Sequence, residues 1–167
     1  MIKINKYIIA TILVLLAAAL SGCTGQAVEK ITEQGQVSLS DDIIFHNTVK
    51  EASALMSASL DLSSGALGRK EYSTFNDYAK QTEGDATKYI QRLNNLTVSA
   101  QNQDMYNEFH LYLENIRDAA IAEQQAVDFL QNDDVDNYVL FLNIAANHLE
   151  KANNHIQRAT AYLRYAS

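Results

Sequence analysis

The sequence predicts an all-α protein: residues 41–167 form an up-down-up-down antiparallel four-helix bundle, which follows a signal peptide and a flexible tether. From Asp41 onward, apolar residues recur at gaps of three and four, the spacing of one face of an α-helix. No useful length of this region alternates apolar and polar residues as a strand does. The chain also contains no proline, so none interrupts its long helices.

The two carboxy-terminal segments have the clearest apolar stripes. The last one carries Val135, Tyr138, Leu142, Ala145, Leu149, Ala152, Ile156, Ala159 and Leu163. From Leu142 on, this stripe alternates large residues with alanine, so a neighbouring helix should approach closely at the alanines. The segment before it carries Met105, Phe109, Tyr112, Ile116, Ala119, Glu123, Ala126 and Leu130.

The two earlier segments repeat the pattern less cleanly. One reads Tyr72, Phe75, Ala79, Thr82, Ala86, Tyr89, Leu93 and Leu96. Its phase continues through Gly84, which predicts one helix and not two. The first segment, about residues 42–63, has Phe45, Val49, Ala52, Met56 and Leu60 beside more polar neighbours.

The predicted connections are short, at residues 65–68, 97–102 and 131–134. Short links between long helices place consecutive helices antiparallel, and four helices sharing apolar stripes form a bundle.

Composition and charge exclude some partners. Without residues 1–22 the chain has 11 basic and 20 acidic residues, a formal charge of −9. Nucleic acid requires a basic stripe and an anionic membrane surface requires a polybasic patch, and the sequence has neither. Cys23 is the only cysteine, so an intrachain disulfide is impossible and the core must stabilise the fold alone.

The amino-terminus has the order of parts typical of an export signal. Lys3 and Lys6 give residues 1–6 a positive charge, and the 14 residues from Tyr7 to Leu20 are apolar except for Thr11. This apolar run is shorter than the ~20 residues of a membrane-spanning helix. It ends in Leu20-Ser21-Gly22-Cys23.

That ending resembles the lipobox of bacterial and archaeal lipoproteins: an aliphatic residue, two small residues and the modified cysteine. The resemblance implies that residues 1–22 are removed and that the Cys23 thiol receives a diacylglycerol, with palmitate among the acyl chains expected there. Two or more acyl chains give stable anchoring where one does not. The alternative is an uncleaved signal anchor, which leaves the domain on the same side of the membrane.

Three regions follow from this interpretation. Residues 1–22 are the lipoprotein signal peptide, residues 23–40 are the lipidated cysteine and its tether, and residues 41–167 are the bundle. We expect the protein on the extracytoplasmic side, at the outer membrane or cell surface depending on the host. Thr24, which is not Asp, favours the outer membrane in a double-membrane bacterium.

Histidines are the weak candidates for metal ligands. His148 and His155 are seven residues apart on one helix face, and His46 is expected at the level of His148. Carboxylate-bridged metal sites in bundles use Glu-x-x-His on facing helices, and this sequence has none. Histidines at the core edge or surface are therefore the favoured interpretation, with no metal and no cofactor. His110 and Glu114 form an i,i+4 pair on the outer face.

Glu123 interrupts an otherwise apolar stripe. It is either a buried acid that binds a ligand or fixes register, or a residue that reaches solvent because Ala120 and Val127 rotate the stripe. The second interpretation is favoured. The tyrosines near the stripes are expected to pack their rings in the core and keep their hydroxyls at the wet edge. Asn95-Leu96-Thr97 fits a glycosylation sequon that an archaeal host could use.

No catalytic grouping is apparent. No serine lies in a Gly-x-Ser-x-Gly turn, no glycine-rich loop precedes a helix, and a lone cysteine cannot attach haem through Cys-x-x-Cys-His. We therefore expect a non-enzymatic interaction or structural module of the cell envelope, with an envelope protein as partner and the membrane held through Cys23. The alternative is a small-ligand or metal-binding bundle that works with a separate membrane partner.

Overall fold

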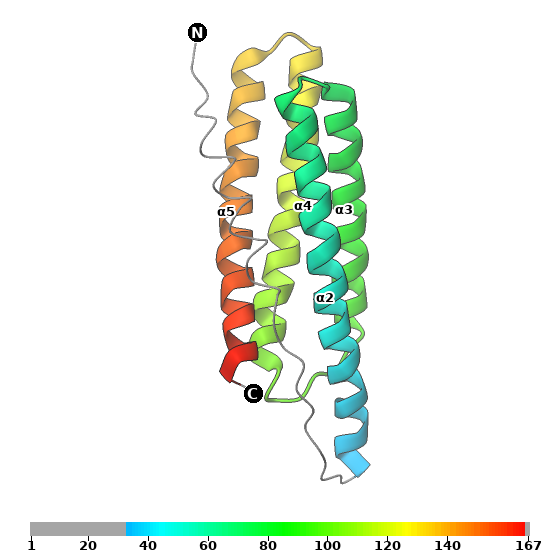
Figure 1. Cartoon of the computed structure of the whole chain (residues 1–167). Coiled ribbons are helices and arrows are strands. Elements are labelled where there is room, and N and C mark those ends of the chain that lie inside the picture. The colour runs from blue at the N-terminus through cyan, green and yellow to red at the C-terminus, as the bar shows by residue number, and fades with distance from the viewer. Residues whose placement is uncertain (1–32, 166–167) are drawn as a thin grey trace.

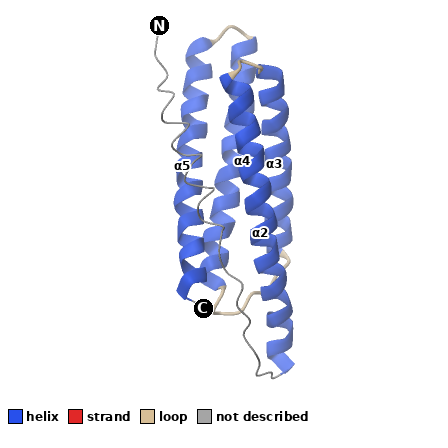
Figure 2. Ribbon diagram, viewed as in Figure 1, coloured by secondary structure: helices blue, strands red, loops and turns tan. Residues whose placement is uncertain are grey.

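The computed structural model describes residues 33–165, with side chains described over residues 39–162. Four helices make up almost all of this range: α2 (Glu33–Gly68), α3 (Tyr72–Asn94), α4 (Gln103–Gln131) and α5 (Val135–Tyr165). Successive helices run in opposite directions (Figure 1), and the links between them lie at the two ends of the bundle (Figure 2). The predicted all-α four-helix bundle is therefore confirmed.

The core follows the predicted stripes. All five predicted core residues of the first segment are buried, and so are Met105 to Ala126 of the α4 stripe. α3 is a single helix, and Gly84 lies exposed on its outer face, as its phase predicts. The expectation fails at the start of the α5 stripe and along one flank, because Val135 is exposed and Leu142 and Leu149 are only half-buried.

α4 and α5 form the most extensive helix pair in the bundle. Small residues on both helices explain this, because short side chains let two helix axes come closer. α5 contributes the buried Ala145, Ala152 and Ala159, and α4 contributes a run of buried alanines between residues 119 and 126. The close approach expected from the alternation of large residues with alanine is therefore found.

The side of the bundle between α2 and α5 is wide. No Cα atom of α2 lies within 8 Å of a Cα atom of α5, although α2 packs against α3 and reaches α4 across the diagonal. Side chains of the two helices still share one core cluster, which includes Phe45 and Met56 of α2 and Ile156 of α5. α5 lies close against α4 and away from α2, and Leu142 and Leu149 are only half-buried.

Two tight turns end helices in the left-handed backbone region. Lys70 has φ 62° after α2, and Asp133 has φ 57° after α4. The backbone N–H groups of Lys70 and Asp133 donate to Leu67 and Leu130, which closes the last helical turn in each case.

α2 is longer than expected. It begins at Glu33, so residues 33–40, which the sequence assigns to the tether, are helical. The apolar pattern of residues 33–40 is too weak to indicate where the helix begins. Directly after this part, the backbone N–H groups of Thr97 and Ser99 donate to the carboxylates of Asp41 (2.8 Å) and Asp42 (2.9 Å).

Candidate functional site

Cys23 lies outside the described residues, so the predicted lipid attachment remains a prediction. The same holds for the removal of residues 1–22. Within residues 33–165, no helix is both long and apolar enough to cross a membrane.

A buried polar layer divides the apolar core. On one side lies the large cluster that ends near Leu60, Ala86 and Ile116, and on the other lies a small cluster around Ala66, Phe75 and Val127. The positions between the clusters hold the buried polar residues Ser59, Ser63, Thr82 and Glu123, which we call the carboxyl layer. A buried acid in the middle of a bundle is the least expected feature of this core.

Glu123 is the centre of the carboxyl layer. Its side chain points into the bundle and is only 8% exposed, so the expectation that it reaches solvent is wrong. Ala120 and Val127, which were expected to rotate the stripe away from it, are themselves buried. α4 contacts helices on two sides and its buried face is therefore wide enough to include all three positions.

The carboxylate of Glu123 has one hydrogen-bond donor among the described side chains. Ser63 Oγ of α2 donates to Glu123 Oε2 at 3.3 Å, which is a long bond. No salt bridge within residues 39–162 involves Glu123. Burial raises the pKa of Glu123 to about 7, and the bond from Ser63 opposes this shift. The group is therefore a carboxyl that titrates near neutral pH inside the core.

The hydroxyl groups of the carboxyl layer have different hydrogen-bond partners. Thr82 Oγ1 donates to the carbonyl of Tyr78 on its own helix, so its hydroxyl is occupied. Next to the layer, Gln124 Nε2 donates to Glu83 at 2.7 Å and links α4 to α3. Ser63 is thus the one layer residue whose hydroxyl is directed at Glu123 in the hydrogen bonds of the described region.

The three candidate metal ligands are engaged separately. His148 Nδ1 lies 3.1 Å from Asn115 Oδ1, and His155 Nδ1 lies 2.7 Å from Glu108 Oε2, both on the edge between α4 and α5. His46 lies on α2, where burial lowers its pKa and the nearby Asp42 opposes that effect. Among the described residues, no three His, Cys, Asp or Glu side chains are placed to hold a metal ion.

His155 belongs to a polar cluster that links α4 to α5. Glu108 accepts hydrogen bonds from His155 and from Arg158 Nε at 3.0 Å. His155 and Glu108 are largely shielded, whereas Arg158 is more than half exposed. These contacts hold the two helices in register near the carboxy-terminal end of α5. His110 and Glu114 form the expected i,i+4 pair, at 3.7 Å.

Two further sequence candidates have different outcomes. Tyr112 is fully buried and its hydroxyl has no hydrogen-bond partner in the described region, so the expectation of a wet hydroxyl is wrong for this residue. Asn95 of the sequon is exposed at the end of α3, where its side-chain amide donates to Gln91. Its exposure is what a glycosylation acceptor needs.

Ser63 and the Asp41–Asp42 pair are the positions that sequence reasoning missed. The signal for Ser63 was its place in the α2 stripe, seven residues after Met56. That spacing puts it on the same inward face, opposite the acid on α4.

The chain matches no model of a known protein family, no curated protein and no solved structure. Its own residues therefore carry the functional argument.

Proposed function

We propose that this is a lipid-anchored extracytoplasmic bundle that serves as a non-enzymatic interaction or structural module of the cell envelope. The observation that carries the proposal is the ordered amino-terminus: a positive start, an apolar run of 14 residues and the Leu20-Ser21-Gly22-Cys23 box. Each part is common alone, and the three together in this order are specific for a lipoprotein.

The bundle suits a module that presents surface at a distance from a membrane. α4 has 29 residues, which gives a rod about 44 Å long. Polar outer faces and buried stripes keep this rod stable without a disulfide. Leu142 and Leu149, half-buried on the wide side between α2 and α5, offer apolar surface to a partner.

Mass spectrometry tests the anchor. The mature wild-type chain is expected to begin at Cys23 and to carry acyl mass, whereas Cys23→Ser should accumulate as a full-length, membrane-held precursor. An unmodified Cys23 in the mature protein would remove the basis of the proposal.

Crosslinking in intact cells tests the partner. A photo-crosslinker placed at Leu142 or Leu149 should trap one envelope protein reproducibly. The same probe at Lys151, on the exposed face of α5, is the matched control. Equal yields from both faces would argue against the wide side as the contact.

A second candidate function rests on the carboxyl layer. A nearly buried carboxylate with a single long hydrogen bond is suited to receive a small cation or a protonated amine. In this second function the bundle binds a ligand and works with a separate membrane partner that recognises the ligand-bound form. A thermal-shift screen of amines and metal ions decides it: a hit should raise the Tm of wild type and leave Glu123→Gln unchanged. Equal shifts in both chains would place the ligand elsewhere.

A further inference from the structure

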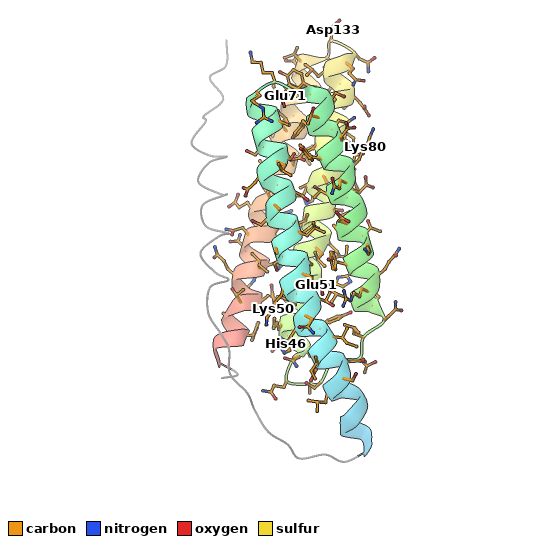
Figure 3. The ribbon with its side chains drawn as sticks, turned by 45° about the vertical axis from the view of Figure 1, so that its right-hand side comes forward. His46, Lys50, Glu51, Glu71, Lys80 and Asp133 are labelled. Atoms are coloured by element: carbon orange, nitrogen blue, oxygen red, sulfur yellow. The ribbon has the colours of Figure 1, made fainter. Side chains whose placement is uncertain are left out.

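The amino-terminal end of α2 projects past the rest of the bundle. Figure 1 shows this end beyond the link between α3 and α4, while the other two links lie at the opposite end. Figure 3 shows His46 and Lys50 toward the projecting end, and Glu71 and Asp133 at the opposite one. The bonds from Thr97 and Ser99 to Asp41 and Asp42 fix the direction in which α2 leaves the bundle.

The projecting end carries an exposed apolar pair. Leu39 is 50% exposed and Ile43 is 56% exposed. They are four residues apart and therefore lie side by side on one flank of α2. Further along, that flank becomes polar, because Lys50 and Asp61 lie seven and eighteen residues after Ile43 and are exposed. On this flank of α2 the apolar pair is thus confined to the projecting end, and exposed leucines such as Leu62 lie elsewhere on the molecule.

The length of chain before α2 limits how the bundle can face an anchor at Cys23. Ten residue steps separate Cys23 from Glu33, and they reach about 36 Å at most when fully extended. α2 spans 36 residues, so its far end lies about 53 Å from Glu33. An upright bundle with its far end on the membrane would hold Glu33 beyond the reach of the anchor. Of the two upright orientations, only the one that turns the end carrying Leu39 and Ile43 toward the lipid is within reach of the anchor.

We propose that this end of the bundle rests on the phospholipid surface, with Leu39 and Ile43 at the boundary between headgroups and acyl chains. The inference rests on the proposed lipid anchor and adds an orientation to it. The contact is apolar, since the acidic Asp41, Asp42 and Asp104 at this end give no attraction to anionic lipid. The end with the Lys70 and Asp133 turns then points outward, toward any partner.

The absence of tryptophan from the chain supplies the probe. Single-tryptophan variants of the full chain, Leu39→Trp and Ile43→Trp, are compared with Leu140→Trp and Leu62→Trp. The control positions are 50% and 51% exposed, which matches the test positions, and they lie far from the projecting end. The acylated proteins are placed in phosphatidylcholine vesicles that contain lipid with a nitroxide high on the acyl chain, and quenching of tryptophan fluorescence is measured.

Quenching is expected to be several-fold stronger at positions 39 and 43 than at positions 62 and 140. Equal quenching at all four positions, or the strongest quenching at position 140, would overturn the orientation. A second preparation couples the Cys23 thiol of the unprocessed chain to a maleimide phospholipid. It reports the orientation even where mass spectrometry shows no natural acylation, so failure of the anchor and failure of the orientation are distinguished.

Discussion

The hydroxyl of Tyr112 lies in the core with no hydrogen-bond partner in the described part of the chain. The centroid of its ring lies 5.4 Å from that of Phe109, so the ring has a packing partner although the hydroxyl has none. A buried donor that lost its water without gaining a partner costs stability. Ser53 Oγ of α2 is in the same condition.

Tyr112→Phe is therefore expected to increase the free energy of unfolding by about 1 kcal/mol. Phenylalanine keeps the ring contacts and removes the unpaired oxygen. Tyr162→Phe, at an exposed position, should change the free energy by less than about 0.5 kcal/mol. Urea melts measure both. A loss of stability in Tyr112→Phe would mean that the hydroxyl has a partner, such as a bound water.

Gly84 gives a second prediction for a single residue. It lies in the middle of α3, and a Cβ atom built on it meets nothing within 4 Å. Gly84→Ala should raise the free energy of unfolding by about 0.5–1 kcal/mol, because alanine has less backbone freedom to lose. Gly65→Ala is the comparison, since its Cβ would lie 3.2 Å from Arg69 Nη1 and the gain should be smaller. Equal gains at both positions would show that the local space is irrelevant.

At the scale of the helices, α5 shows that residues on one apolar stripe can differ in burial. Ile156 is buried, Leu149 on the same stripe is half-buried, and Asn147 and Lys151 are exposed. The stripe alone predicts equal burial for the first two. The wide side of the bundle explains the difference, because Leu149 packs only against the edge of the core cluster, whereas Ile156 lies within it.

Ile156→Ala should cost about 2–4 kcal/mol of stability and Leu149→Ala distinctly less, because less surface is lost and water can fill the space. Asn147→Ala and Lys151→Ala should stay below about 0.5 kcal/mol. Denaturant melts of the four variants rank them. A cost at Leu149 as large as that at Ile156 would contradict the half-buried position of Leu149.

Helix number and most of the core could be predicted from the apolar spacing, because an amphipathic helix must bury its apolar face. Helix direction could be predicted from the short links. The start of α2 could not be predicted, since residues 33–40 lack an apolar face. The bonds of the next two residues, Asp41 and Asp42, go to a loop far away in sequence. The wide side between α2 and α5 could not be predicted either. It depends on how closely the side chains let α2 pack on α3, α3 on α4 and α4 on α5.

The carboxyl layer shows the same limit for the site. The sequence identified Glu123 as unusual. Whether its side chain faces the core or the solvent depends on how much of the α4 surface the neighbouring helices cover. Its partner Ser63 is 60 residues away in sequence, and no local pattern links the two. The three histidines do not meet, and this too depends on neighbours on other helices: His148 contacts Asn115, and His155 contacts Glu108.

For the whole molecule, Glu123 predicts a dependence of stability on pH. Its folded pKa of about 7 lies above its reference value of 4.5. The folded state therefore holds a proton that the unfolded chain releases between these values, and stability falls as pH rises through this window. The loss amounts to about 3 kcal/mol. Below pH 4.5 the full contribution is present.

Glu123→Gln should remove this part of the pH dependence and be more stable than wild type above pH 7. Glutamine keeps the size and can accept the bond from Ser63, but carries no charge. Glu150→Gln, on the exposed face of α5, should retain the wild-type profile. Chemical melts from pH 4 to pH 8 provide the measurement. Parallel profiles for wild type and Glu123→Gln would show that the carboxyl is not buried in solution.

The wide side has a mechanical consequence. Tension applied to the amino-terminal side of the chain enters the fold through α2, which packs mainly against α3 and keeps every Cα more than 8 Å from those of α5. The bonds from Thr97 and Ser99 to Asp41 and Asp42 take the load first. If they break, α2 peels away while the α4–α5 pair stays intact, and the Ser63–Glu123 contact is pulled open. A pulling force is then expected to admit water to Glu123, which would favour its charged form and couple stretching of the chain to proton release.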